Sequence, residues 1–130
     1  MTEPSTTIGW SPIVVKSLGA NARGVIVTQV FPSERSIAFA MVKEAQAMVS
    51  AKAGAALSPA MLEGFAAAKV LVEGLQRAGK NPTRERLRAA LEGIKNFNLG
   101  GLEIGYGPDD HTGLEFVDLS IVGADGRFMR

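Results

Sequence analysis

The sequence predicts a mixed α/β fold that is short of β-sheet. Three helical patterns fill the middle of the chain, near residues 36–52, 58–78 and 81–94. Strand-like runs occur at 24–30 and after residue 100. Only the first of these runs has the composition of a central strand, so we expect a second copy of the chain, or a longer parent protein, to supply more sheet.

The N-terminal part predicts one short helix and one strand. Ser11 can cap a helix over residues 11–18, and Gly19 can end it. The run "GVIVTQV" at 24–30 is β-branched and almost continuously apolar, which predicts a strand buried on both faces. Pro32 cannot donate a ladder hydrogen bond and so ends the strand.

The helix predicted at 36–52 is amphipathic. Its polar side carries Lys43, Glu44 and Gln46. Such a pattern predicts packing on one side only. The predicted apolar face consists of Ile37, Met41, Val42, Ala45, Met48 and Val49.

The helix predicted at 58–78 is the most apolar segment of the chain. Ser58 can cap it, Pro59 suits its first position and Gly79 can close it. A helix this apolar must be covered over most of its circumference. The predicted core face consists of Met61, Phe65, Ala68, Val72 and Leu75, widened by Ala67 and Leu71.

A third long helix and a β-rich tail complete the chain. Asn81 or Thr83 can cap the helix at 81–94. The runs "LEIGY" and "LEFVDLSIVG" predict strands, and Asp125-Gly126 predicts a hairpin turn after the second run. The apolar stripe of the helix consists of Leu87, Ala90, Leu91 and Ile94.

Composition excludes several classes of function. The chain has 14 basic and 13 acidic residues, so no basic surface is available for nucleic acid. It has no cysteine, which excludes disulfides, thiolate catalysis and cysteine metal sites. The N-terminus "MTEPSTTIGWSP" has neither the basic nor the apolar region of a signal peptide. As written, the chain is therefore expected to be cytoplasmic or a piece of something longer.

Three stretches carry a family resemblance: "GVIVTQVFP", "LEGFAAAKVLVEGLQRAGKNPTRERLRAALE" and "GPDDHTG…VDLSIVGADGRF". In this order they resemble the C-terminal third of bacterial solute-binding proteins of the branched-chain amino acid type, the periplasmic binding proteins of type I that feed ABC transporters. The resemblance covers residues 11–130. The family is much longer and begins with a signal peptide, so the chain departs from it in length.

The resemblance implies a partial three-layer αβα fold, one truncated unit over residues 1–130 that homodimerisation or a strand or segment swap completes. Family members have two lobes joined by three crossovers, with the ligand between the lobes. By position, the resemblance assigns 11–30 to the second lobe, 31–36 to a crossover, 37–106 to the first lobe, 107–113 to another crossover and 114–130 to the second lobe again.

The resemblance also implies site residues. Phe65 falls where the family has an aromatic residue that points into the cleft, but its place on the predicted apolar face of the helix favours a core residue. Glu63 could hydrogen-bond a ligand, although an acid near a helix N-terminus is favourable by itself. The crossovers imply hinge roles for Phe31, Pro32, Pro108, Asp110 and Gly113.

His111 is the only histidine of the chain and follows Asp109 and Asp110. A metal site generally needs three or four protein ligands, so we expect a solvated loop residue and no metal. No nucleophile is paired with a base in the sequence, so we expect neither an enzyme nor a cofactor.

The resemblance implies a fragment of an extracytoplasmic receptor for ABC-type uptake of branched-chain or related amino acids or small carboxylates, which binds by lobe closure without chemistry. Its expected partners are the amino acid and an ABC permease in the full-length protein, and a second copy for the fragment itself. The alternative is a stand-alone cytoplasmic α/β module for protein interaction or ligand sensing.

Overall fold

The computed structural model describes residues 12–52 and 55–129 of the 130-residue chain. These residues form two compact units. Unit 1 consists of the described residues up to Val30 and from Val117 onward, and unit 2 consists of Phe31–Phe116. Among the described residues, none of the helices has both the length and the apolar character that a membrane span requires.

Unit 1 is a small antiparallel sheet with one helix. α1 (Pro12–Leu18) runs on into a 3-10 turn (Gly19–Ala22). The sheet has the order β1-β4-β5, from strands Ile26–Gln29, Asp118–Val122 and Phe128–Met129. Ile26 pairs with Ile121 in the antiparallel register of β1 and β4. The core of the unit consists of Val15, Ala22, Val27 and Val122.

The α-helix predicted at 11–18 ends at Leu18 as expected, and Gly19, with a φ of 52°, begins a separate 3-10 turn; the proposed cap Ser11 lies outside the described residues. One expectation for unit 1 is wrong. Strand β1 is not buried on both faces, since Ile26 is 67% exposed while Val27 is 2% exposed. The reason is that β1 is an edge strand of a three-stranded sheet with one covered face.

The C-terminal hairpin forms as predicted. β4 and β5 pair antiparallel, with Val122 opposite Phe128. Gly126 N–H donates to the Gly123 carbonyl, and the Asp125 carboxylate accepts from Arg127 N–H at 3.1 Å. The Asp-Gly signal therefore located the turn correctly.

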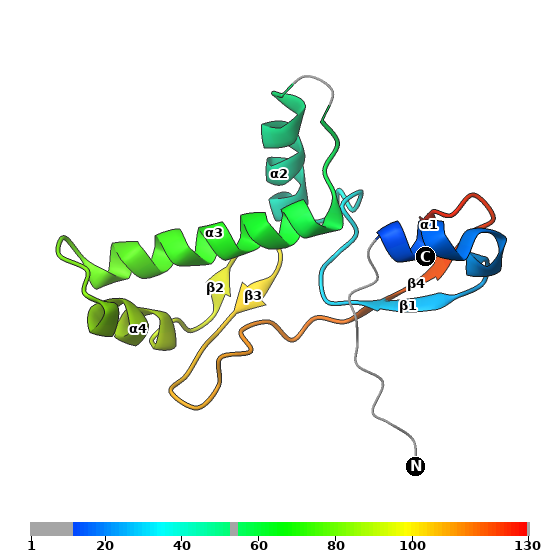
Figure 1. Cartoon of the computed structure of the whole chain (residues 1–130). Coiled ribbons are helices and arrows are strands. Elements are labelled where there is room, and N and C mark those ends of the chain that lie inside the picture. Colours follow the sequence, from blue (N-terminus) through cyan, green and yellow to red (C-terminus); the bar gives the residue numbers. More distant parts are fainter. Residues whose placement is uncertain (1–11, 53–54, 130) are drawn as a thin grey trace, which may run out of the picture. The chain divides into compact units, whose positions relative to one another are not determined.

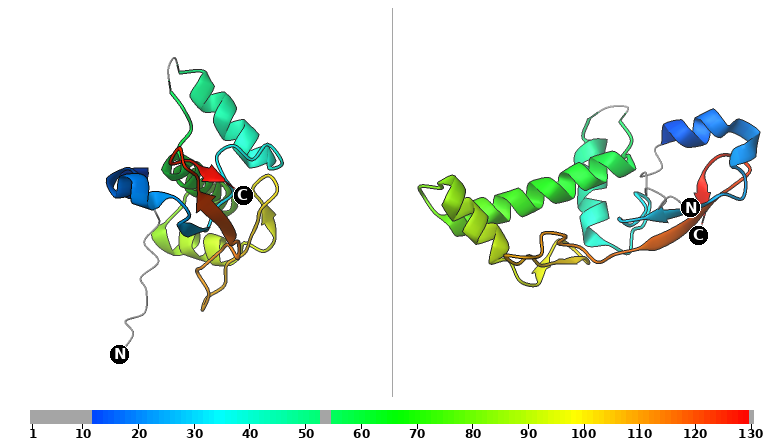
Figure 2. Two further views of the ribbon diagram at one scale, coloured as in Figure 1. Left: turned by 90° about the vertical axis from the view of Figure 1, so that its right-hand side faces the viewer. Right: turned by 60° about the horizontal axis from the view of Figure 1, so that its bottom comes forward.

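Unit 2 contains the three long helices. α2 (Ala40–Ser50) stands against the N-terminal part of α3 (Pro59–Ala78), and α4 (Arg84–Glu92) lies along its C-terminal part (Figures 1 and 2). A two-stranded hairpin, β2 (Phe97–Asn98) with β3 (Glu103–Ile104), follows α4. Sequence patterning did not predict β2.

The capping residues predicted for α3 and α4 are confirmed. Ser58 Oγ accepts from Met61 N–H at 3.2 Å, Pro59 takes the first position and Gly79 is the C-cap. Thr83, rather than Asn81, caps α4 by accepting from Arg86 N–H. These signals are local, so they do not depend on tertiary structure.

α2 begins at Ala40, later than the predicted start at residue 36. Residues before it form turns instead, with Ser36 N–H donating to the Ser33 carbonyl and Phe39 N–H donating to the Ser36 carbonyl. Gln46 on α2 then donates from its side chain to the Glu34 carbonyl at 2.8 Å. This bond holds the turns against the helix.

The core of unit 2 uses a different face of α3 from the predicted one. The buried residues of α3 are Leu62, Ala66, Val70 and Gly74. The predicted core residues Met61 and Val72 are 50% and 52% exposed, and Leu71 and Leu75 are exposed too. α3 is apolar on two opposite sides, and unit 2 covers one of them. The core residues of unit 2 are Met41, Val42, Ala45, Leu62, Ala66, Val70, Ile94, Leu99, Leu102 and Ile104.

α2 follows its prediction in part. Met41, Val42 and Ala45 are buried, as expected. Met48 is exposed because it lies near the end of the helix, and Ile37 is exposed in the turns before it. The amphipathic pattern therefore predicted the correct side of the helix but extended it too far at both ends.

Candidate functional site

The predicted site residue Phe65 lines an apolar hollow of about 280 Å³ in unit 2. The hollow lies where α2, the connection after it and the first turns of α3 meet. Its walls carry one charged side chain, that of Lys52. The lining residues are Ala45, Met48, Val49, Lys52, Ala55, Leu57, Met61 and Phe65.

The Phe65 ring is part core and part surface. It is half-buried and packs against the core of unit 2. The ammonium group of Lys69 lies 5.5 Å from the ring centroid, which is a cation–π distance. Lys69 also forms an ion pair with Glu44 on α2 at 2.5 Å. The ring therefore has one apolar side toward the hollow and one side beside a paired cation.

Glu63 does not join Phe65 at this hollow. Glu63 is exposed on α3 and does not line the hollow. Among the described residues that line the hollow, no acid could meet a ligand ammonium group. The roles of Phe65 and Glu63 as ligand contacts stay predictions.

A second hollow, of about 460 Å³, was not predicted from the sequence. It lies between α3, α4 and the residues after β3. Val70, Leu87 and Leu91 supply its apolar wall. The polar and aromatic residues of the lining are Arg84, Arg88, Glu92, Tyr106 and His111.

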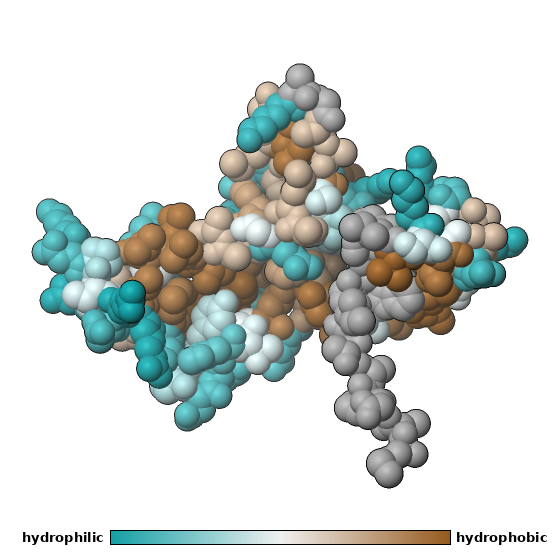
Figure 3. Space-filling view, in the orientation of Figure 1, coloured by the Kyte–Doolittle hydropathy of each residue, from teal (hydrophilic) through white to brown (hydrophobic). Residues whose placement is uncertain are grey.

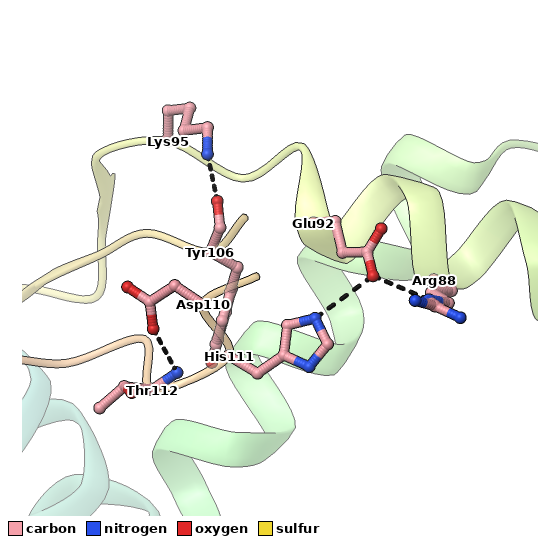
Figure 4. A network of polar contacts seen from close by, with 7 residues as sticks. All are labelled: Arg88, Glu92, Lys95, Tyr106, Asp110, His111 and Thr112. Carbon is pink, nitrogen blue, oxygen red and sulfur yellow. Dashed lines mark hydrogen bonds and ion pairs between the residues drawn. The ribbon is translucent and has the colours of Figure 1, made fainter. Parts of the chain in front are cut away.

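A polar network borders the second hollow (Figure 4). Glu92 Oε1 lies 2.7 Å from Arg88 Nε and 3.2 Å from His111 Nε2. The hydrogen bond from Arg88 holds the pKa of the Glu92 carboxyl below its ordinary value, and His111 adds to this effect. His111 is exposed, as predicted, but it is paired with α4 rather than solvated alone.

The loop at 107–113 is held by further hydrogen bonds. Asp110 Oδ1 accepts from Thr112 N–H at 2.9 Å, and this bond lowers the pKa of the Asp110 carboxyl. Lys95 Nζ donates to the Tyr106 carbonyl (Figure 4). Among the described residues, no group of three or more acidic or histidine side chains could hold a metal ion.

The predicted hinge residues fall in two places. Phe31 and Pro32 begin unit 2, where Pro32 is buried and Phe31 packs against the core. Pro108 and Asp110 are exposed in the loop at 107–113, and Gly113 bridges to Gly105. The boundary of unit 2 follows Phe116, slightly after that loop. The hinge roles themselves stay predictions.

The sequence pattern of the periplasmic binding protein family matches residues 5–126. The chain belongs to this family. Family members are periplasmic binding proteins and are not enzymes, which agrees with the lack of a paired nucleophile in the sequence. The comparison with curated proteins finds no match.

Solved structures of family members resemble the chain over most of its length. A substrate-binding periplasmic protein from Ralstonia solanacearum is 34% identical, with a TM-score of 0.75 over 91% of this chain and 35% of that one. A possible leucine/isoleucine/valine-binding protein from Rhodopirellula baltica is 31% identical, with a TM-score of 0.76 over 90% of this chain and 32% of that one. The chain thus spans about a third of the length of these relatives.

Proposed function

We propose that the chain is the C-terminal third of an extracytoplasmic receptor for branched-chain or related amino acids or small carboxylates. The observation that carries the proposal is its match to one third of solute-binding relatives, one of them a possible leucine/isoleucine/valine-binding protein. In such a receptor the solute is bound by closure of two lobes, without covalent chemistry. An ABC permease is the proposed recipient.

The division into two units supports the lobe assignment. Unit 2 would belong to one lobe and unit 1 to the other, with the chain crossing near Phe31–Pro32 and again after the loop at 107–113. The three-layer αβα arrangement would then need sheet from outside these residues. For the isolated chain, we propose that homodimerisation or a segment swap supplies it.

Phe65 is the proposed contact for an apolar ligand side chain. Its hollow is apolar and lies at the start of α3. With about 280 Å³ it is slightly smaller than complete ligand pockets, which start at about 300 Å³. Its open shape fits one wall of a cleft whose polar groups lie elsewhere. Glu63 is the weaker proposed contact, because it is outside this hollow.

A chimeric receptor tests the proposal. These 130 residues would replace the matching segment of the R. baltica relative, and melting would be followed with leucine, isoleucine, valine and small carboxylates. A ligand at 100 times its Kd stabilises a protein by about 2.7 kcal/mol. We expect the ligand to raise the Tm of the chimera. Phe65→Ala should reduce this ligand-induced shift. Lys80→Ala, at an exposed position past the end of α3, should leave the shift unchanged. A chimera that melts cooperatively without any shift, while the intact relative shows one, would contradict the proposal.

A further inference from the structure

The second hollow has no part in the proposed solute contact at Phe65. It lies within unit 2, between α3, α4 and the residues after β3. Its volume of about 460 Å³ falls inside the range of about 300–1,000 Å³ that is usual for small-molecule pockets. Hydrophobic surface gathers along α3 in Figure 3, and α3 supplies one wall of this hollow.

The apolar wall of the second hollow is formed by closely packed helices. Val70 is buried on α3. A Cβ atom at Gly74 of α3 would lie 2.6 Å from Leu91 Cδ2 and 3.3 Å from Leu87 Cδ1, so both leucines of α4 lie directly over this glycine. Because these contacts already exist in the folded unit, the wall is formed before any ligand arrives.

The Tyr106 side chain lines the hollow on the side of the loop at 107–113. A Cβ atom at Gly113 would lie 2.5 Å from Tyr106 Cε1, so the missing side chain leaves space for the ring. Tyr106 N–H donates to the Ile94 carbonyl at 2.9 Å, and the Tyr106 carbonyl accepts from Lys95 Nζ. An aromatic ring held in this way can pack against an apolar ligand through its face or its edge.

The charged lining of the second hollow favours an anion. Arg84 and Arg88 carry positive charges and Glu92 carries a negative one, so positive charge is in excess. Glu92 is already paired with Arg88 and with His111 (Figure 4). Within residues 12–52 and 55–129, no group forms a hydrogen bond or ion pair with the Arg84 side chain. The guanidinium group of Arg84 is therefore available to a ligand.

We propose that the second hollow binds a small carboxylate with an aromatic or branched aliphatic body. Arg84 receives the carboxylate, because a planar guanidinium group can donate two parallel hydrogen bonds to it. The apolar body packs against Leu87, Leu91 and Tyr106. The site shares no lining residue with the hollow at Phe65, so it does not depend on the proposed function.

Titration of the 130-residue chain with 3-phenylpropionate, followed by amide NMR shifts, tests this site. 3-Phenylpropanamide has a similar shape without the charge, and acetate has the charge without the apolar body. We expect saturable shifts at residues 84–92 and 106–111 with 3-phenylpropionate, and binding weaker by about tenfold or more for each of the other two ligands. Equal affinity for 3-phenylpropanamide, or no saturable shift with 3-phenylpropionate, would overturn the proposal.

Arg84→Gln removes the proposed contact to the anion at an exposed position, where the fold should stay intact. Arg86→Gln is the matched control, since Arg86 is exposed on the same helix but does not line the hollow. Arg84→Gln should weaken binding of 3-phenylpropionate by about tenfold or more, because hydrogen bonds between charged groups are the stronger kind. Arg86→Gln should leave the affinity unchanged. Equal losses in the two variants would reveal a general effect of positive charge and overturn the proposal.

The same titration in the R. baltica chimera separates this site from the solute site. We expect 3-phenylpropionate to bind in the presence of excess leucine, isoleucine and valine, with affinity reduced by Arg84→Gln but not by Phe65→Ala. Displacement of the probe by these amino acids would overturn the proposal. So would the absence of binding in a chimera that melts cooperatively, because the rest of the receptor would then fill the hollow. Binding through Arg84 without any shift in Tm from the amino acids or small carboxylates named above would support the second site and contradict the proposed solute.

Discussion

Glu92 at the end of α4 and His111 in the loop after β3 lie 3.2 Å apart, between Oε1 and Nε2, although 19 residues separate them in sequence. Arg88 contacts the same carboxylate oxygen from one turn earlier on α4. The carboxylate therefore joins the helix to the loop at 107–113. Its effect on stability should depend on pH.

The first prediction concerns acid stability. The pKa of Glu92 is lowered in the folded chain, chiefly by the hydrogen bond from Arg88. A depressed pKa means that the ionised carboxylate stabilises the fold at neutral pH, and that this contribution is lost as pH falls below the ordinary value near 4.5. Glu92→Gln should therefore lower the Tm at pH 7, and the difference from wild type should shrink as the pH falls from about 4.5 through the lowered pKa of Glu92.

Glu103→Gln is the control for this prediction. Glu103 is exposed on β3, away from the network. Wild type and variant will both weaken in acid, since the pKa values of Glu85 and Asp110 are lowered as well. Only the difference between them reports on Glu92. An equal Tm difference at pH 7 and pH 3 would contradict the prediction.

The second prediction tests which face of α3 is core. Leu62 is fully buried, whereas its neighbour Met61 is half exposed. Leu62→Ala should destabilise unit 2 by about 2–5 kcal/mol, because it removes buried methyl groups and leaves a cavity. Met61→Ala should change the stability by about 0.5 kcal/mol or less, as is usual at surface positions. Urea unfolding of both variants measures the two losses of stability. A larger loss for Met61→Ala than for Leu62→Ala would contradict this prediction and favour the core face predicted from the sequence.

Local signals predicted the ends of α3, but its buried face could not be predicted in the same way. Ser58, Pro59 and Gly79 act through the backbone beside them, so their effect can be read from neighbouring residues. Leu62 and Met61 are both apolar, and only the tertiary partners decide which one is buried. The same reason explains β1, whose composition fits a central strand although it is an edge strand here.

The site was predicted least well. Phe65 does line an apolar hollow, yet no pattern in the sequence indicated the larger hollow beside α4. That hollow depends on contacts such as Glu92 with His111, which are distant in sequence. β2 was not predicted because a strand of two residues shows no periodicity. The turn after it is shaped by the Asn98 side chain, which accepts hydrogen bonds from Gly100 N–H and Gly101 N–H.

The third prediction concerns the contact between α3 and α4. A Cβ atom at Gly74 would lie 2.6 Å from Leu91 Cδ2, so glycine allows the two helices to approach. Gly64, on the same helix, has no such neighbour within 4 Å. Gly64→Ala should raise the free energy of unfolding by about 0.5–1 kcal/mol through helix propensity. Gly74→Ala should gain nothing or lose about 1 kcal/mol, because overpacking offsets that gain. Equal stabilisation by both substitutions, measured in urea, would show that the helices can separate freely.

The fourth prediction concerns the turn between β2 and β3. Gly100 has a φ of 108° and accepts a hydrogen bond from Met41 N–H at 3.0 Å, which joins the turn to the start of α2. A Cβ atom there would lie 2.6 Å from that backbone nitrogen, and a backbone atom cannot move aside as a side chain can. Gly79 also has a positive φ, of 84°, but its Cβ would meet nothing within 4 Å. Both alanine variants carry backbone strain of about 1–3 kcal/mol. Gly100→Ala should lose about 1–3 kcal/mol more than Gly79→Ala, because it also displaces α2 from the turn. Chemical unfolding of the pair measures this difference, and equal losses would mean that the contact between the turn and α2 contributes nothing to stability.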